Sequence, residues 1–384
     1  FGSGIMGEYD NVVFRLQAVP AITNSRNQVP GPYLYGSYAG DTFPFRVRGS
    51  QVRVLSGTTP VSNALVYRLP AGQTSGGAPY ASLAGEPFRT DGQGYLQGRG
   101  EIHVGDRLLA LAPVPLPPTY TQRYSDSLRL YYTNATPTET GLDAFTVATP
   151  GVQTITVSAA RPLLLFDLDV SVEWDAHNDP TYLDQLEFDL KQASKNLYDF
   201  TNGQAALGRI TVHQHADDWE TSHLLVYATN RLRPWAAQGG IVLTPTVDPG
   251  HSDIVYGIGQ VSMGATWNRY GAPGQSQGVD WPLALAHELA HYLLYLDDTY
   301  LGLNEDGLLI PLDSCTSSAM GDVYAPDNTE FVDDGAWLTP PPKCADTLAN
   351  VTLERSEWAT VRLWYPWLSS IANPGPSLMP VSYT

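Results

Sequence analysis

The sequence predicts a multidomain protein in which an all-β domain precedes an α/β domain. Three observations lead to this expectation. The chain has 384 residues, more than a single domain commonly contains. Short runs of alternating apolar and polar residues dominate up to about residue 160. Beyond that point strand patterns are interspersed with helical patterns, an order that is typical of α/β or α+β domains.

The composition limits the classes of partner. Asp and Glu number 39 against 21 Lys and Arg, which gives a formal net charge of −18. This charge argues against nucleic acid and anionic membrane surfaces as partners, but it is compatible with acidic loops that bind Ca²⁺. No run of 18 or more apolar residues exists, so no transmembrane helix is expected. The chain begins with Phe1 and carries no visible signal peptide, so we expect a processed form or a fragment.

The N-terminal part divides into three predicted segments. Residues 1–44 mix Gly, Pro, Asn and Tyr without a helical period and are expected to form an extended lead-in. Residues 45–118 contain FRVRGSQVRVL, SNALVYRL, DGQGYLQGRGEI and DRLLALAPV, strand-length runs separated by Gly, Pro and Asp turns. They predict a small antiparallel β-sandwich. Residues 119–160 continue with strand patterns such as LRLYYTN and VQTITVSA, and we expect a β connecting segment there.

Residues 161–372 are predicted to form the α/β domain. The run LLLFDLDVSVEW is typical of a buried strand. The helix that follows should be capped by Asp179, carry Pro180 in its first turn and end near Gly203. The runs RITVHQH, HLLVYA and GGIVLT are predicted strands, and GQVSMGATW precedes a second helix that contains HELAH. Residues 373–384 are expected to form a linker or tail.

The HELAH motif offers metal chemistry. On a helix, residues i and i+4 lie on one face one turn apart, so His287 and His291 can bind one Zn²⁺. Glu288 lies beside them and can act as a general base on a metal-activated water. The alternative is a chance match on an apolar helix. Only eight His occur in the chain, and burying two of them with a Glu without a metal would be costly, so the metal interpretation is favoured.

A catalytic zinc site needs a third protein ligand, and the residues alone leave its identity open. Asp297 and Asp298 follow His291 by six and seven positions. The spacing HExxHxxGxxH/D selects Asp297, with Leu294 at its Gly position, whereas a spacing one residue longer selects Asp298. Helical angle favours Asp298 slightly. Seven helical residues rise about 10.5 Å, so the helix must end before either Asp can reach the metal. Glu305 is the next candidate.

The stretch HELAHYLLYLDDTY resembles HExxHxxxGxxDEY in the catalytic domain of calcium-activated chloride channel regulator proteins and their bacterial relatives, which are metzincin-like zinc peptidases. The resemblance implies that the two histidines are zinc ligands, that the glutamate between them is the acid/base, and that Asp298 is the third ligand. Tyr300 matches the closing Tyr of the pattern. The sequence departs from the pattern at Tyr295, which replaces the Gly, and at Thr299, which replaces the Glu.

A second part of the resemblance lies downstream. Metzincin-like peptidases pass a Met-containing turn beneath the zinc, and SCTSSAMGD places Met320 after small residues and before Gly321. The resemblance therefore implies Met320 as the Met-turn residue, and the alternative is an ordinary core Met. Upstream, NLYDFTNGQAALGRITV resembles the helix-to-strand region of bacterial members. The resemblance spans residues 161–372.

The N-terminal domain carries a separate resemblance. The segments TPVSNALVYR and RTDGQGYLQGRGEIHVGDRLLAL resemble the carboxypeptidase-regulatory-like, immunoglobulin-like domains often found beside secreted catalytic domains. This implies an immunoglobulin-like sandwich that serves as a spacer or binding module and performs no chemistry.

The chain has only two cysteines, Cys315 and Cys344, on either side of the predicted Met-turn and the acidic segment. With no other thiols, we expect one disulfide that closes this loop. The alternative is two buried free thiols. A disulfide implies an extracellular or cell-surface setting.

Three functions compete on this basis. The first is a secreted or surface zinc endopeptidase that hydrolyses protein or peptide substrates with Glu288 as general base. The second is a non-catalytic surface or filament module that retains the metallopeptidase fold and belongs to a larger surface assembly. The third is a carbohydrate-binding or adhesive protein with Ca²⁺ in the loop 322–334. The intact Glu288 favours the enzyme, and the lack of Gly in residues 292–301 favours the second function.

Overall fold

The computed structural model describes most of the chain between residues 51 and 370. The described residues are 51–69, 78–79, 87–97, 102–138, 141–149, 151–229, 231–269, 280–312, 315, 317–338 and 344–370. The predicted lead-in and tail lie outside them.

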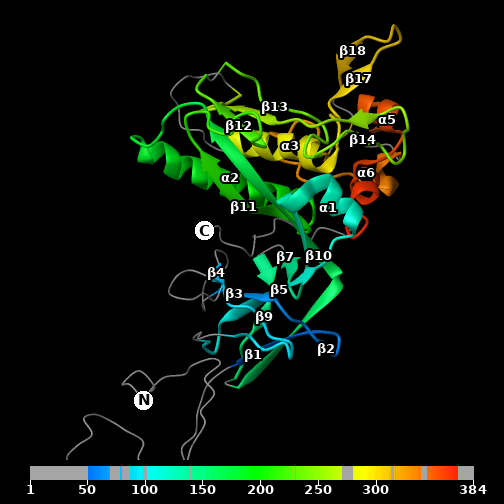
Figure 1. The fold of residues 1–384 in the computed structure, drawn as a ribbon. Helices are drawn as coiled ribbons and strands as arrows, with labels where there is room; N and C mark the ends of the chain where they lie inside the picture. Colours follow the sequence, from blue (N-terminus) through cyan, green and yellow to red (C-terminus); the bar gives the residue numbers. More distant parts are fainter. Residues whose placement is uncertain are drawn as a thin grey trace, which may run out of the picture.

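A large mixed sheet of 12 strands runs through the molecule (Figure 1). Its strands are β1 (Gln51–Ser56), β2 (Thr59–Pro60), β3 (Leu65–Leu69), β4 (Ala78–Pro79), β5 (Arg107–Val114), β6 (Leu128–Thr133), β9 (Phe145–Thr146), β10 (Val152–Val172), β11 (Ala205–His213), β12 (Leu224–Tyr227), β13 (Trp235–Ala236) and β16 (Val261–Gly264). The main path is β13-β16-β12-β10-β6-β5-β3-β4, and β1 and β11 also pair with β10. β10 is parallel to β1, β11 and β12 and antiparallel to β6, so the sheet is mixed.

Strand β10 joins the two halves of the molecule, and its 21 residues run from one half into the other (Figure 1). Its first part pairs with β1 and places Ile155 and Val157 in the N-terminal hydrophobic core. Its second part pairs with β11 and β12 and places Phe166 and Val170 in the C-terminal core. The predicted boundary between residues 160 and 161 falls inside this strand. The described residues do not show an immunoglobulin-like sandwich over 45–118. Strands β1 to β5 of that range belong to the same sheet as the strands of the C-terminal half.

Helices and small hairpins make up the remaining regular elements of the described residues. The helices are α1 (Pro118–Tyr124), α2 (Pro180–Phe200), α3 (Asp280–Leu294), α4 (Asp334–Trp337), α5 (Leu348–Leu353) and α6 (Glu357–Trp364), with short 3₁₀ turns η2 (Ser125–Ser127) and η3 (Cys344–Asp346). The hairpins are β7 (Thr136–Thr138) with β8 (Gly141–Asp143), β14 (Thr246–Val247) with β15 (Val255–Tyr256), and β17 (Leu301–Leu303) with β18 (Leu309–Pro311). The described part of the chain contains no helix with the length and apolar character that a membrane crossing requires.

Helix α2 begins and ends where the sequence signals predict. The Asp179 carboxylate accepts a hydrogen bond from the Tyr182 amide at 3.1 Å, and Pro180 occupies the first helical position. After the helix, Gly203 adopts φ 78° and its amide donates to the Tyr198 carbonyl at 2.7 Å. The cap, the first-turn proline and the glycine stop are therefore confirmed.

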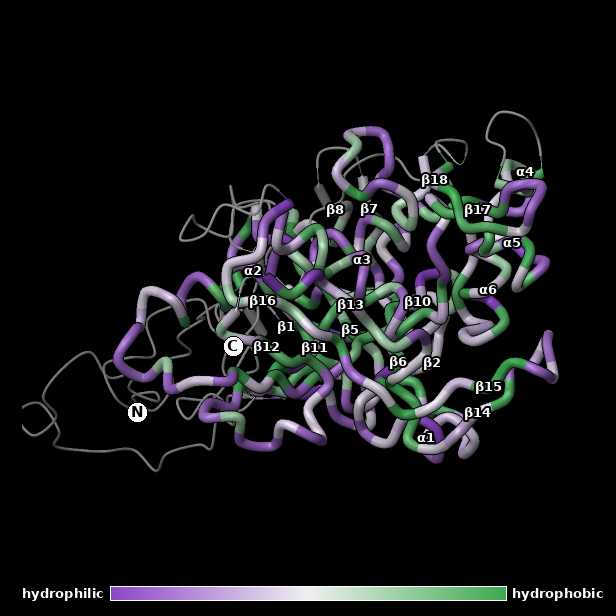
Figure 2. Tube along the Cα trace, turned by 90° about the horizontal axis from the view of Figure 1, so that it is seen from above, coloured by the Kyte–Doolittle hydropathy of each residue, from purple (hydrophilic) through white to green (hydrophobic). Residues whose placement is uncertain are grey.

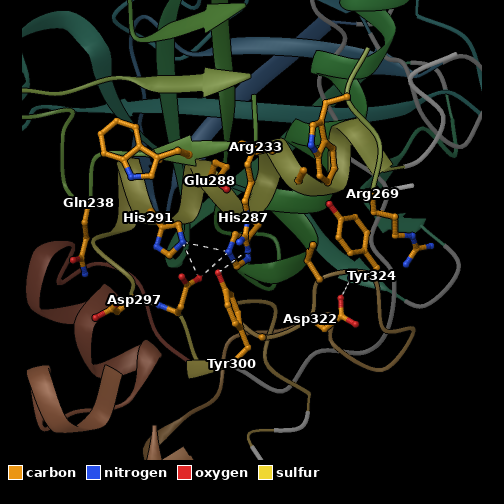
Figure 3. A pocket seen from close by; sticks show the side chains of 18 residues that line it. Arg233, Gln238, Arg269, His287, Glu288, His291, Asp297, Tyr300, Asp322 and Tyr324 are labelled. Atoms are coloured by element: carbon orange, nitrogen blue, oxygen red, sulfur yellow. Dashed lines mark hydrogen bonds and ion pairs between the residues drawn. The ribbon is translucent and has the colours of Figure 1, made fainter. Parts of the chain in front are cut away.

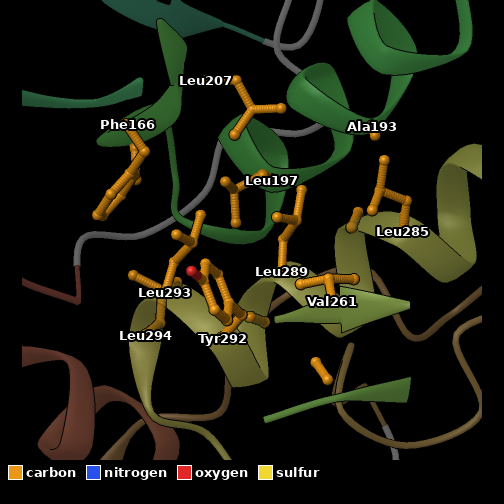
Figure 4. Close-up of a cluster of buried hydrophobic side chains, with 14 of the residues drawn as sticks. Phe166, Ala193, Leu197, Leu207, Val261, Leu285, Leu289, Tyr292, Leu293 and Leu294 are labelled. Atoms are coloured by element: carbon orange, nitrogen blue, oxygen red, sulfur yellow. The ribbon is translucent and has the colours of Figure 1, made fainter. Parts of the chain in front are cut away.

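The main hydrophobic core lies between α2, α3 and the second half of the sheet. Leu197 of α2, Leu289 and Leu293 of α3, and Val261 of β16 are buried together (Figure 4). In Figure 2 the hydrophobic residues gather around β11 and β12, which lie in this core. The α/β character is thus confirmed in the form of a mixed α/β protein with one large mixed sheet. The predicted strand GGIVLT is wrong, because Gly239 to Ile241 form a turn against the end of α3.

The predicted disulfide is present. Cys315 and Cys344 are bonded across a sequence separation of 29 residues, with 4.4 Å between their Cα atoms. Both are buried in a small cluster with Val332, Trp337 and Ala349. The bond therefore ties the segment that carries Met320 to the C-terminal helices.

Replacing Cys315 and Cys344 together by Ser is expected to lower the free energy of unfolding by about 3 kcal/mol, because the unfolded chain loses a loop constraint. Denaturant unfolding of the oxidised protein and the double variant measures this difference. Reduced wild-type protein should match the variant. Equal unfolding free energies for the oxidised protein and the variant would contradict a stabilising bond.

Candidate metal centre

Helix α3 carries the HELAH motif deep in the molecule. Thirteen of its 15 residues are buried, since it packs on α2 and on the strands β13 and β16. His287 and His291 are 7% and 9% exposed, and their rings lie one helical turn apart with centroids separated by 4.8 Å. Both rings face a pocket of about 960 Å³, and Glu288 lines the same pocket. The helix prediction and its one-face placement of the two histidines are confirmed.

Three side-chain atoms that could bind a metal converge in this pocket. The His287 Nε2 and the His291 Nε2 are 3.2 Å apart, and the Asp298 Oδ1 lies 3.1 Å from each of them (Figure 3). A tetrahedral Zn²⁺ at 2.0–2.1 Å from each ligand would hold neighbouring ligand atoms about 3.3 Å apart. The spacing of the three atoms therefore fits a small metal ion. Among the described residues, these three form the group whose donor atoms could hold a metal.

The opposite nitrogen of each ring fixes the tautomer. The His287 Nδ1 lies 3.0 Å from the Ala319 carbonyl oxygen, and the His291 Nδ1 lies 2.7 Å from the Leu296 carbonyl oxygen. A carbonyl only accepts, so each Nδ1 carries its proton and donates it. In the neutral rings each Nε2 then presents a lone pair, and so does the Asp298 carboxylate. Three lone pairs this close are stable only with a cation or an additional proton between them.

The pKa values of these side chains reflect how strongly they interact with one another. Burial opposes the charge on His291, but the hydrogen bond and charge of Asp298 outweigh it and raise the pKa of His291 to about 9. Burial also opposes the charge on Asp298, yet its contacts with the two histidine rings, when these carry an Nε2 proton, hold its pKa well below the usual range. Burial raises the pKa of Glu288, against the opposing charges of the two histidines. A raised pKa brings a glutamate closer to neutral pH, where a general base works best.

A left-handed residue brings Asp298 to the histidines. Helix α3 ends at Leu294, and Tyr295 adopts φ 63°, which turns the chain sharply. Tyr295 occupies the position of the Gly in HExxHxxxGxxDEY. The turn thus forms without a glycine.

Tertiary packing holds Tyr295 in this conformation. A tyrosine in the left-handed region costs about 1 kcal/mol or more. Its ring is fully buried and stacks on Trp364 at 3.7 Å between centroids and 3° between planes, and its hydroxyl lies 2.9 Å from the Tyr124 hydroxyl. Gly239 leaves room for the ring, since a Cβ there would lie 2.4 Å from it. The Gly239 amide also donates to the His291 carbonyl at 2.9 Å, which satisfies one free carbonyl of the helix end.

Replacing Tyr295 by Gly is expected to lower the free energy of unfolding by about 3 kcal/mol, because the lost ring packing outweighs the relieved backbone strain. Tyr295→Phe keeps the stack and loses the hydroxyl contact with Tyr124, so a loss of only about 1 kcal/mol is expected. Denaturant unfolding of both variants measures this. A Tyr295→Gly variant as stable as the wild type would mean that the stack with Trp364 does not maintain the turn.

The alternative third ligands lie elsewhere. Asp297 lines the pocket, but its Oδ1 accepts a hydrogen bond from the Asp298 amide at 2.8 Å, and burial raises the pKa of its carboxyl. It does not belong to the group of three. Glu305 is exposed in the turn between β17 and β18. The geometry favours Asp298, as the longer spacing predicts.

Met320 lies in a turn beside His287. Met320 is fully buried, and the neighbouring Ala319 carbonyl receives the Nδ1 proton of His287. The Met320 carbonyl accepts a hydrogen bond from the Thr299 amide at 2.9 Å, next to Asp298. The turn thus contacts both His287 and the segment that carries Asp298.

A buried carboxyl group that the sequence did not reveal supports this turn. The Ser318 hydroxyl bonds to a Glu357 carboxylate oxygen and lies 2.9 Å from the Thr299 hydroxyl, and the Val332 amide donates to the other Glu357 oxygen at 2.5 Å. Glu357 is 3% exposed, and burial raises its pKa to about 7 despite these hydrogen bonds. Its place at the start of α6 gives no signal in the sequence, because Glu is common in the first turn of a helix.

The acidic loop behaves as a structural segment in the described residues. Asp322 accepts from the Tyr324 amide, Asp333 caps α4, and Asp334 pairs with Arg362 at 2.6 Å. The loop assignment is confirmed for residues 322–333, and the expectation of Ca²⁺ there stays a prediction.

Further pocket residues were not identified from the sequence. Aromatic rings line it on both sides, and Trp267 stacks with Tyr324 at 6.0 Å between centroids. Arg233, Trp235 and Gln238 come from the segment around β13, one of the shortest strands and therefore a weak sequence signal.

Comparison with known proteins does not assign the chain to a family. A scan of the chain against protein-family models finds no matching family, and a search of curated proteins finds no similar sequence.

Proposed function

We propose that the protein is a zinc-dependent endopeptidase. The observation that carries the proposal is the convergence of the His287 Nε2, His291 Nε2 and Asp298 Oδ1 within 3.2 Å, with both Nδ1 protons committed to backbone carbonyls. Two imidazoles and one carboxylate are a usual ligand set for catalytic zinc, which keeps a further position for water or substrate. The large pocket in front of these atoms leaves room for a peptide segment.

The metzincin-like character of the site is part of the proposal. The left-handed turn at Tyr295 and the entry of Asp298 into the ligand group support the register HExxHxxxGxxDEY. The turn at Met320, which lies against His287 through the Ala319 carbonyl, supports its role as the Met-turn.

The chain's own residues would divide the chemistry between binding and proton transfer. When bound, a zinc ion would polarise the substrate carbonyl and lower the pKa of a bound water. Glu288 lines the pocket beside the ligands and would take a proton from the attacking water and return it to the leaving amine. The raised pKa of Glu288, caused by burial, suits both transfers.

We further propose a secreted or cell-surface setting. The buried disulfide between Cys315 and Cys344 supports it, because such bonds persist in oxidising compartments. The N-terminal half contributes no residue to the pocket among the described residues, which fits the proposed spacer or binding role.

Zinc analysis combined with a casein digest tests the proposal. We expect about one equivalent of zinc per chain and cleavage that a chelator abolishes and added zinc restores. Zinc without cleavage of casein or a peptide library would favour the non-catalytic surface or filament module. If the chain retains less than about a tenth of an equivalent and binds no added zinc, the metal assignment is wrong.

A further inference from the structure

Arg233 is a charge in the pocket that the proposed hydrolysis does not use. The other arginine of the pocket, Arg269, pairs with Asp280 at 3.4 Å and lies over the Tyr324 ring. Arg233 contacts the neutral Tyr300 hydroxyl at 3.4 Å, and among the described residues no carboxylate lies within 4.0 Å of it. In a chain of net charge −18, a pocket arginine that has no ion-pair partner in the described part of the chain is a position at which an anion can bind.

The residues after Arg233 restrict the conformation of its backbone. Pro234 follows Arg233 and is buried, and a residue before proline is held in extended conformation. The next residues, Trp235 and Ala236, form β13, the end strand of the sheet path and a wall of the pocket. The Arg233 side chain is exposed, but its backbone is joined to a buried proline and to a strand of the sheet.

The guanidinium group faces the reaction centre. It donates to Tyr300, whose ring centroid lies 6.4 Å from that of His287 (Figure 3). Arg233 lines one pocket together with Glu288 and with the His287, His291 and Asp298 side chains.

We propose that Arg233 binds a substrate carboxylate beside the scissile bond, so that the enzyme prefers peptides with an acidic group there. The inference rests on the proposed peptidase function. A guanidinium has five N–H donors, and the Tyr300 contact uses one, so a two-pronged bond to a carboxylate stays available. One peptide residue spans about 3.3–3.6 Å, so a carboxylate at Arg233 belongs to a residue within one or two positions of the cleaved bond.

Two sources can supply this carboxylate, an Asp or Glu side chain within a peptide or the free C-terminus of the peptide. Four peptides of one parent sequence separate them. They carry Glu or its isostere Gln beside the scissile bond, each with a free or an amidated C-terminus. Binding is measured on the zinc-loaded Glu288→Gln variant, which should leave the peptide uncleaved. Cleavage is measured on protein that retains Glu288.

We expect Arg233→Gln to weaken binding of the carboxylate-bearing peptide by about tenfold and to leave binding of its amide counterpart unchanged. If the affinity difference between Glu and Gln peptides disappears in Arg233→Gln, the carboxylate is the Glu side chain. If the difference between free and amidated peptides disappears, it is the C-terminus. Arg233→Glu should reverse the preference. Arg231→Gln is the matched control, because Arg231 is exposed two residues earlier and lies outside the pocket.

Equal losses for all four peptides, or no preference for a carboxylate in the parent protein, would overturn the assignment to Arg233. Failure of the proposed function has a different signature. In that case the zinc-loaded wild type cleaves none of the peptides. The effect of Arg233→Gln on peptide affinity can still be measured in the Glu288→Gln background.

Discussion

Glu288→Gln is expected to lower kcat for peptide hydrolysis by roughly 10²–10⁴-fold, because the amide cannot accept the proton of the attacking water. Zinc stoichiometry and the unfolding midpoint should stay at wild-type values, since Glu288 does not belong to the group of three ligand atoms. Steady-state kinetics on a quenched fluorescent peptide, together with elemental analysis of the same samples, measures both quantities.

Asp322→Asn provides the matched control for this experiment. Asp322 lines the same pocket and loses a charge in the same way, but it lies outside the ligand group and bonds to the Tyr324 amide. Its kcat should remain within a few-fold of wild type. If Glu288→Gln releases zinc, Glu288 holds the metal and its assignment as a base is wrong. If it retains both zinc and activity, proton transfer depends on another group.

Asp298→Ala is expected to weaken zinc binding by well over tenfold, and Asp297→Ala to weaken it far less. Asp298 supplies the only carboxylate oxygen within 3.1 Å of both Nε2 atoms among the described residues. Asp297 instead supports the turn through the Asp298 amide, so its loss affects the metal only through the position of its neighbour. Competition with a chromogenic chelator measures the two affinities under one condition.

The comparison of these neighbouring variants is decisive because both remove one carboxylate from one segment. A greater loss of zinc in Asp297→Ala would assign the shorter spacing, HExxHxxGxxH/D, to this chain. If neither variant loses zinc, the third ligand is not in this segment. Asp298→Asn adds a test of charge, because its side-chain oxygen can still reach the metal.

Local signals in the sequence predicted the elements that present the site. The cap at Asp179 and the stop at Gly203 define α2, and the spacing of His287 and His291 places both rings on one face of α3. These signals act within a few residues of one another, so a single sequence contains the information. The strand runs HLLVYA and RITVHQH were correct in type. β12 covers Leu224–Tyr227, whereas β11 covers Ala205–His213 and so begins four residues before the predicted run.

Other features depend on contacts between distant residues, and the sequence did not reveal them. Tyr295 takes a conformation that usually requires Gly because Trp364, Tyr124 and Gly239 surround its ring from positions between 56 and 171 residues away. The same contacts explain the wrong prediction for GGIVLT, whose first glycine serves the end of α3 and not a strand. Likewise, only the folded chain brings Glu357 to Ser318.

Because β10 passes unbroken from one hydrophobic core into the other, the chain has no natural point of excision near residue 160. A recombinant piece that starts there would take β11, β12 and the β10 residues 162–166, and so leave β6 without most of its partner residues. Both fragments would then expose strand edges that invite aggregation. The same continuity means that β10 can transmit force between the two halves. Tension applied to the N-terminal half would be transmitted along the backbone of β10 into the sheet beside α3. A strand of the sheet, and not a flexible linker, would then connect the pocket to whatever holds the N-terminal half.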